Sequence, residues 1–376
     1  MLEFLSDYTI RNVAMGAALL GLISGVLGCF AVLRRQALLG DTLSHAALPG
    51  VCLGFIIAGG REIGSILAGA LFTGMLAALV MLALTRSSRL KTDAGLGIAL
   101  SVFFAIGIVM LTYIQNTGNA AQGGLDSFLF GQAAAILRSD LWAMGGVTLV
   151  ALAIVATFWK EFKLVTFDPQ YARALGFPVL VLETALTAMI ALAVVVGLQM
   201  VGVVLMAAMV IAPAVAARQW TGRLETMVAL SAVIGIVSGV VGAFISALGR
   251  GLATGPLIVL AASAAVGISL LFAPERGLLW EYIKRIQDRR QLRGQRVLTT
   301  LYRLAAHHGD SAYPSEQGMV DAYHGIGTTP VMKRLQSRGL VEPAVHRPET
   351  TPHWVLTADG IAEAERVLAS LGAKEA

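Results

Sequence analysis

Apolar runs long enough to cross a lipid bilayer as helices recur along the first 275 residues of the chain. They lie near residues 12–33, 43–60, 64–85, 94–114, 140–158, 179–198, 200–217, 225–248 and 255–273. A helix of about 20 apolar residues spans about 30 Å of hydrocarbon. The sequence therefore predicts an all-α polytopic membrane body with about eight or nine transmembrane helices. Residues 124–138 are ambiguous and fit a re-entrant or interfacial segment.

Charge divides the chain into two parts. Only 14% of all residues are charged, against about 25% in soluble domains. Half of the 28 lysines and arginines fall in residues 276–376. We therefore expect a transmembrane domain over 1–275, a basic juxtamembrane linker helix over 276–295 and a water-soluble domain over 296–376.

Basic residues follow every second apolar run, which sets the orientation. Positive charge collects in cytoplasmic loops of membrane proteins. The pattern predicts a multi-pass membrane protein with its N-terminus outside and its C-terminal domain in the cytoplasm. The residues that carry this signal are Arg34, Arg35, Arg86, Arg89, Lys91, Lys160, Lys163, Arg173, Arg218 and Arg223.

The segment GDTLSHAALPG (40–50) opens the second run and holds the only histidine of the first 275 residues. Asp41 precedes His45 by four positions, so both side chains share one helix face. A carboxylate with an imidazole suits Mn²⁺, Fe²⁺ or Zn²⁺. Pro49 removes the helical partner of the His45 carbonyl, and Ser44 is a neighbour that could orient the pair. Spacing alone fits equally well a helix-capping Asp41 and a His45 bonded to a neighbouring helix.

A second polar segment, KEFKLVTFDPQYARALGFP (160–178), lies between two runs on the predicted cytoplasmic side. Asp168 before Pro169 is a helix-start signal, and Gly176 ends the helix. A short cytoplasmic helix of this kind suits either contact with a motor subunit or a plain interfacial linker.

The sequence also lacks the parts of an energy-converting enzyme. No lysine follows a glycine, so a phosphate-binding Walker A loop is absent. Acidic and histidine residues do not form a proton relay within the runs, and no nucleophilic constellation stands out. We therefore expect no enzyme active site, and any nucleotide hydrolysis that the protein needs must come from another polypeptide.

Three segments resemble the permease of manganese, zinc and iron ABC importers, the ABC-3 family. They are GDTLSHAALPG, FDPQYARALGFP and the block VGVVLMAAMVIAPAVAARQ (201–219) followed by SALGRGLATGPLIVLAASAAVG (246–267). The resemblance implies alternating-access uptake of Mn²⁺, Fe²⁺ or Zn²⁺ as substrate, with no permanently bound cofactor. It makes Asp41 and His45 the metal-contacting pair of the transport path.

The resemblance also implies partners. These are a cytoplasmic ABC ATPase, a metal-binding lipoprotein or periplasmic binding protein, and a second permease copy or a sister permease; membrane lipids surround the whole. The segment seated on the ATPase would comprise Asp168, Pro169, Gln170, Tyr171, Ala172, Arg173, Ala174, Leu175 and Gly176.

The tail resembles a small α+β winged helix-turn-helix of the metal-dependent repressor group, through VMKRLQSRGLV and LTADGIAEAERVL. Lys333, Arg334 and Arg338 would contact phosphates if it bound DNA. Its nearly balanced charge and its membrane tether argue against nucleic acid and favour a regulatory or ATPase-contacting role. Two alternatives remain for the whole chain: a siderophore or vitamin ABC permease, and a membrane-anchored winged-helix regulator.

Overall fold

The structure is a computed structural model that describes most of the chain. It covers residues 8–60, 62–116, 131, 133, 136–249, 252–274, 276–310, 313–325, 327–345 and 351–372. Two compact units divide at residue 278, with Met1–Leu278 in the first and Leu279–Ala376 in the second. Most of the ambiguous stretch 124–138 lies outside the described residues.

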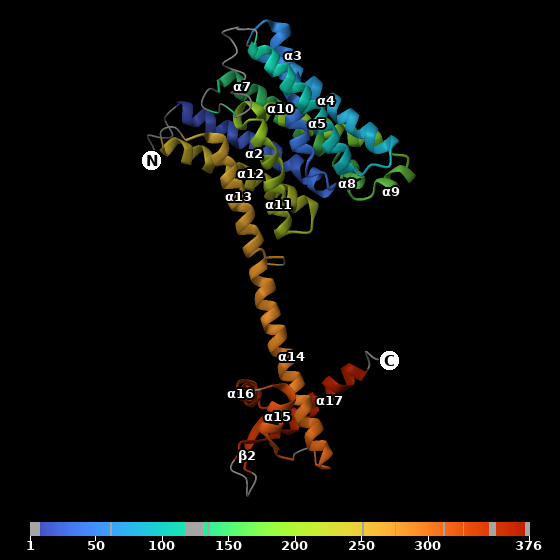
Figure 1. The fold of residues 1–376 in the computed structure, drawn as a ribbon, viewed down its shortest axis with the longest axis vertical. Helices are drawn as coiled ribbons and strands as arrows, with labels where there is room; N and C mark the ends of the chain where they lie inside the picture. The colour runs from blue at the N-terminus through green and yellow to red at the C-terminus, as the bar shows by residue number, and fades with distance from the viewer. Residues whose placement is uncertain are drawn as a thin grey trace. The chain divides into compact units, whose positions relative to one another are not determined.

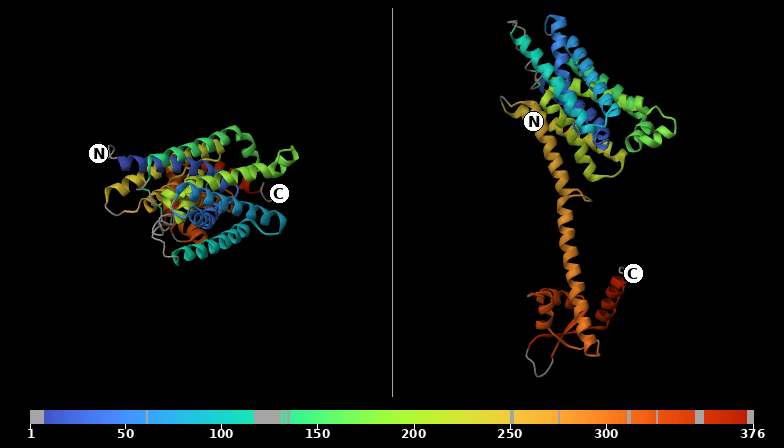
Figure 2. Two further views of the ribbon diagram at one scale, coloured as in Figure 1. Left: turned by 90° about the horizontal axis from the view of Figure 1, so that it is seen from above. Right: turned by 45° about the vertical axis from the view of Figure 1, so that its right-hand side comes forward.

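The first unit is built of helices (Figures 1 and 2). They are α2 (Tyr8–Leu33), α3 (Leu39–Ala58), α4 (Ile63–Ser87), α5 (Thr92–Asn116), α7 (Arg138–Thr157), α8 (Trp159–Phe167), α9 (Pro169–Ala174), α10 (Val179–Val201), α11 (Val203–Trp220), α12 (Leu224–Leu248) and α13 (Thr254–Phe272).

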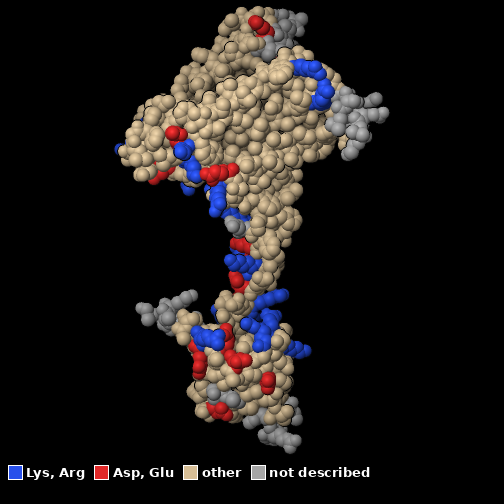
Figure 3. Space-filling view, turned by 180° about the vertical axis from the view of Figure 1, so that it is seen from behind, with Lys and Arg blue, Asp and Glu red and all other residues tan. Residues whose placement is uncertain are grey.

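The predicted membrane body is confirmed at the level of its helices. Among the described residues, 8 helices are long and apolar enough to cross a membrane, and a shorter apolar helix covers Leu205–Trp220. Each of the nine apolar runs in the sequence has become one of these helices. On the face seen in Figure 3, charged side chains of this unit are few and most of the surface is uncharged.

Small residues hold the central helix α2 against its neighbours. A Cβ at Gly21 would lie 2.1 Å from the carbonyl oxygen of Gly235 on α12. A Cβ at Gly28 would lie 1.9 Å from the carbonyl oxygen of Val210 on α11. At these two points the backbones touch, and only glycine fits. This is the usual way in which membrane helices gain packing contacts, because lipid gives them little hydrophobic reason to associate.

The second unit combines helices with a small sheet. Its elements are α14 (Leu278–His307), β1 (Ser315–Glu316), α15 (Gln317–His324), α16 (Thr329–Ser337), β2 (Val341–Ala344), β3 (His353–Leu356) and α17 (Ala358–Gly372). The strand order is β1-β3-β2, with antiparallel pairing that sets Val341 opposite Leu356 and Ser315 opposite Trp354.

A separate apolar core stabilises this unit. Val297, Leu301, Met332 and Val341 are almost fully buried in it, together with Trp354. Helices α16 and α17 cover most of the two motifs VMKRLQSRGLV and LTADGIAEAERVL, and the β2–β3 hairpin lies between these helices. The predicted linker helix and the first helix of the tail form one continuous helix, α14.

Candidate functional site

Asp41 and His45 lie one turn apart in the first two turns of α3, and their side chains meet. His45 Nε2 is 3.3 Å from Asp41 Oδ1, with side-chain exposures of 19% and 34%. The prediction that both side chains share one helix face is confirmed. Each side chain is more than half buried within a largely apolar unit. Ionisable groups are costly in such a place, so a functional role is the simplest explanation for their presence.

The other ring nitrogen of His45 is unsatisfied. Nδ1 is buried and has no hydrogen-bond partner among the described residues. The ring packs edge-on against Phe104, with 4.7 Å between ring centroids. A buried polar atom without a partner costs about 1–3 kcal/mol. Histidines that bind metals commonly turn the other nitrogen toward a carboxylate, and the contact with Asp41 has that form.

The pair alone supplies too few ligands for a permanent metal centre. Within the described part of the chain, no group of three or more His, Cys, Asp or Glu side chains could hold an ion. Cys29 and Cys52 are both buried and reduced; their thiols lie near the carbonyl oxygens of Gly25 and Gly107. The arrangement suits an ion that stays briefly and keeps other ligands such as water.

Ser44 and Pro49 occupy different surroundings from the pair. The Ser44 hydroxyl donates to the carbonyl oxygen of Gly40 at 2.7 Å and is buried. Pro49 lies inside α3 and is also buried. Pro49 has no N–H to donate to the carbonyl of His45, four residues earlier. The main chain beside the ring therefore offers an acceptor free of the usual helical bond.

The predicted short helix between two apolar helices is present as α9. Asp168 accepts a hydrogen bond from the Tyr171 N–H at 2.9 Å, and Pro169 occupies the first turn. Gly176 follows the helix with a φ of +84°, a conformation that glycine adopts without strain. The helix-start and helix-end signals of the sequence therefore mark the two ends of α9.

One side of α9 faces inward and the other presents apolar side chains. Ala172 is fully buried, whereas Tyr171 and Leu175 are 55% and 54% exposed. Phe167, at the end of α8, is 58% exposed. Exposed aromatic and aliphatic side chains next to one another are typical of a contact surface for another protein.

Comparison with known proteins assigns the family. Residues 6–273 match the ABC 3 transport family. The chain belongs to this family. It is therefore the membrane-spanning permease subunit of an ABC transporter and not a catalytic subunit.

Relatives of the permease are named for metal transport. It is 47% identical over 290 residues to the manganese transport system membrane protein MntC of Bacillus subtilis, covering 77% of this chain and 67% of that one. It is 45% identical over 285 residues to the zinc transport system membrane protein TroC of Treponema pallidum, covering 76% and 96%. The solved structure of PsaBC from Streptococcus pneumoniae in complex with Fab gives a TM-score of 0.65 at 32% identity, covering 75% of this chain and 97% of that chain.

A charged cluster in the permease escaped the sequence reasoning. Glu183 on α10 contacts Arg34, just beyond α2, at 3.3 Å, and it also contacts Arg86 on α4. The Arg34 and Glu183 side chains are only 9% and 17% exposed. The pKa of Arg34 is lowered, because the effect of burial is larger than the opposing effect of the nearby Glu183 carboxylate. The only sequence signal for this cluster was a single acidic residue near the end of one apolar run and two arginines that follow two other runs.

This cluster adjoins α9. A pocket of about 750 Å³ is lined by Arg34, Arg86 and Glu183 together with Gln170 and Arg173 of the α9 segment. Helix α10 begins at Val179, soon after this segment. Glu183 therefore lies in the second turn of the helix that follows α9. The cluster thus links the ends of α2, α4 and α10 beside the exposed helix.

The three basic residues singled out in the tail are not equivalent. Lys333 and Arg334 lie on α16, and Arg338 follows its last residue. Arg334 and Arg338 line the same pocket of the second unit, whereas Lys333 does not.

Proposed function

We propose that the permease carries Mn²⁺, with Fe²⁺ and Zn²⁺ as the next candidates, across the bacterial cytoplasmic membrane by alternating access. Relatives named for manganese and for zinc transport support this range of ions. All three ions accept a mixture of oxygen and imidazole ligands. Mg²⁺ and Ca²⁺ prefer sites made of oxygen ligands alone.

The observation that carries the proposal is the Asp41–His45 pair with its unsatisfied Nδ1. Before an ion arrives, the carboxylate holds the ring in one orientation. The ring offers Nδ1 to an arriving ion as it stands. The Asp41 carboxylate becomes a second transient ligand once it leaves Nε2 and the two side chains turn toward the ion. Water or the same pair from a second permease copy completes its coordination shell. Ser44 and Pro49 act as neighbours of the path, Pro49 through the freed carbonyl of His45.

Energy comes from a separate ATPase that binds the segment from Asp168 to Gly176. Tyr171 and Leu175 are the proposed anchors because they are apolar and exposed. Movement of α9 reaches α10 directly through the chain and reaches α2 and α4 through Glu183. A metal-binding lipoprotein or periplasmic protein delivers the ion, and the functional unit contains two permeases, either identical or related.

The tail is proposed to be a winged helix-turn-helix domain on the cytoplasmic side. Helices α14, α15 and α16 precede the β2–β3 hairpin in the order expected of that fold. Its role is regulation or contact with the ATPase and not DNA binding. The basic connections after α2, α4 and α7 lie on the same side under the positive-inside rule, which places the N-terminus outside.

Uptake by the reconstituted complex tests the metal assignment. Permease, ATPase and binding protein are assembled in liposomes, and entry of radioactive Mn²⁺ is followed with Zn²⁺ or Fe²⁺ in competition. Loss of even an outer-shell partner costs about 10–100-fold in metal affinity. Asp41→Ala and His45→Ala should therefore each lower uptake at least about tenfold, while Asp93→Ala, an exposed acid in the first turn of α5, should not.

The same assembly separates the alternatives. His45→Ala should retain the ATPase on co-purification, whereas Tyr171→Asp should lose it. Normal uptake by both Asp41→Ala and His45→Ala would remove the site. Uptake of a chelated metal complex that free Mn²⁺ does not compete with would indicate a siderophore or vitamin permease. A membrane-anchored regulator would lose its whole phenotype on deletion of 296–376, whereas a transporter would retain part of its uptake.

A further inference from the structure

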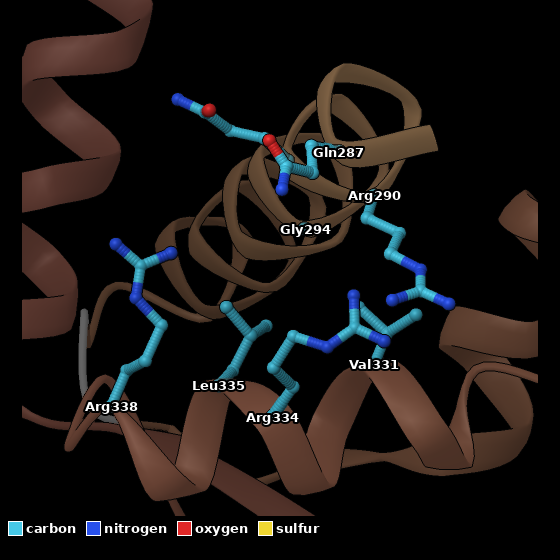
Figure 4. A pocket seen from close by; sticks show the side chains of 8 residues that line it. Gln287, Arg290, Gly294, Val331, Arg334, Leu335 and Arg338 are labelled. Atoms are coloured by element: carbon cyan, nitrogen blue, oxygen red, sulfur yellow. The ribbon is translucent and has the colours of Figure 1, made fainter. Parts of the chain in front are cut away.

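Three arginines surround one pocket of the second unit, between α14 and α16. Arg290 comes from α14, and Arg334 and Arg338 come from α16 and its end. The pocket has a volume of about 360 Å³. Figure 4 shows the side chains of Arg334 and Arg338 rising from α16 toward α14 on either side of Leu335. The other lining residues are Gln287, Gln291, Gly294, Val331 and Leu335.

The floor of this arginine pocket is fixed by packing between the two helices. Val331 and Leu335 are 5% and 3% exposed and belong to the core of the unit. A Cβ placed at Gly294 would lie 3.9 Å from Leu335 Cδ2, so α16 packs against α14 at this point. The arginine stems are therefore anchored on two helices that cannot easily separate to relieve their mutual repulsion.

The positive charges of the pocket are not balanced from within it. Its lining includes no carboxylate, and none of its three arginines forms an ion pair among the residues the structure describes. Elsewhere in the unit, Arg285 and Arg366 do have acidic partners, Glu281 at 2.5 Å and Glu363 at 3.1 Å. Like charges gathered in one hollow repel each other. An anion bound between them would remove that repulsion.

We propose that the arginine pocket binds a phosphate group, carried by a soluble phosphate compound or by the headgroup of an anionic phospholipid. Guanidinium forks match phosphate oxygens in geometry as well as in charge. The side-chain amides of Gln287 and Gln291 add neutral donors at the α14 wall. A volume of about 360 Å³ falls in the range of small-ligand pockets, about 300–1,000 Å³.

The geometry favours a small phosphate over duplex DNA. A helix-turn-helix protein reads DNA by laying an exposed helix face in the major groove. Here Arg334 and Arg338 turn toward α14 of their own domain (Figure 4). Gln287 follows Phe272, the last residue of the last apolar helix, by only 15 residues along the chain, so a lipid headgroup is one of the two phosphate sources to be tested.

Titration of the full-length protein with inorganic phosphate tests the pocket. Protein in phosphatidylcholine nanodiscs is studied by calorimetry, and the variant Arg290→Gln/Arg334→Gln is compared with the control Arg289→Gln/Lys333→Gln. Both variants lose one charge from each of the same two helices, but only the first pair lines the pocket. Because hydrogen bonds from a guanidinium to a phosphate are among the stronger ones, the pocket variant should bind phosphate at least about tenfold more weakly. The control should stay within about twofold of the parent protein.

A second lipid composition distinguishes the two sources. With phosphatidylglycerol added to the nanodiscs, a lipid-headgroup site would be occupied already, and added phosphate would no longer bind. A site for a soluble compound would bind phosphate equally in both nanodiscs. Either result supports the pocket.

Three results would overturn the proposal. They are absence of phosphate binding in phosphatidylcholine nanodiscs, equal loss of binding in the two variants, and displacement of phosphate by duplex DNA at a comparable concentration. Should the double variant fold poorly by near-ultraviolet circular dichroism, the single variant Arg338→Gln must show the loss. The test measures no metal transport, so it stands or falls independently of the proposed uptake function.

Discussion

Glu183→Gln provides a quantitative test of the charged cluster beside α9. The substitution keeps the shape of the side chain but removes the negative charge that Arg34 and Arg86 share. Arg34 is then left 9% exposed with no acidic partner in the cluster and with Arg86 still nearby. Removing one member of a buried ion pair costs about 3–5 kcal/mol. Because Arg86 is 38% exposed and water reaches that side, we expect a loss of about 2–3 kcal/mol in the free energy of unfolding.

An exposed ion pair of the same unit supplies the control. Lys163 Nζ and Glu225 Oε1 are 2.5 Å apart, but their side chains are 45% and 53% exposed. Ion pairs that open to water are screened and contribute little, so Glu225→Gln should cost far less stability than Glu183→Gln. The double variant Arg34→Met/Glu183→Met should recover much of the loss, because apolar replacement of a buried pair is often neutral or better.

Unfolding of the purified permease by sodium dodecyl sulfate in mixed micelles, followed by circular dichroism, measures these differences. The loss in the free energy of unfolding should be largest for Glu183→Gln and clearly smaller for both the double variant and Glu225→Gln. If Glu183→Gln costs no more than Glu225→Gln, the cluster is not a desolvated network and the reasoning fails. In liposomes, Glu183→Gln should also slow uptake, since the cluster joins α10 to α2 and α4.

Two further predictions concern packing and pH. Gly28→Ala brings a methyl group to 1.9 Å from the Val210 carbonyl oxygen and should lower the free energy of unfolding by at least about 2 kcal/mol through overpacking. Gly74→Ala is the control, because a Cβ there meets no neighbouring atom within 4 Å. Equal yields of monodisperse protein from the two variants on size exclusion would contradict the close approach at Gly28. Burial and two nearby arginines lower the pKa of His324 from its ordinary 6.5, so the folded state binds the proton less readily than the unfolded state. The stability of the second unit should be complete above about pH 6.5 and fall as the pH drops below it. Thermal melts at pH 7.5 and 5.5 should differ less for His324→Gln, and an unchanged difference would contradict this origin.

Local features of the sequence carried most of the secondary structure. The length of each apolar run determined which segments are helical, because a chain in lipid must form its backbone hydrogen bonds within helices. Asp168, Pro169 and Gly176 set the bounds of α9 through capping, which needs only neighbouring residues. The four-residue spacing of Asp41 and His45 likewise places them on one face of any helix.

Contacts between distant segments required the tertiary structure. Glu183 is adjacent in sequence to neither Arg34 nor Arg86, and an apolar run does not indicate which helix will pack beside it. Strand β1 has two residues, too few for an alternation signal, and exists because β3 provides hydrogen-bond partners. The arginine pocket arises only when α16 packs on α14 at Gly294.

The sequence by itself therefore determined which segments are helical, which are apolar and where the pair Asp41–His45 sits on its helix. These properties depend on residues within a turn or two of each other and on the solvent. The tertiary structure decided which charges are neutralised, leaving Glu183 paired and Arg290, Arg334 and Arg338 unpaired among the described residues. Electrostatic pairing depends on distance in space, and packing of remote helices sets that distance.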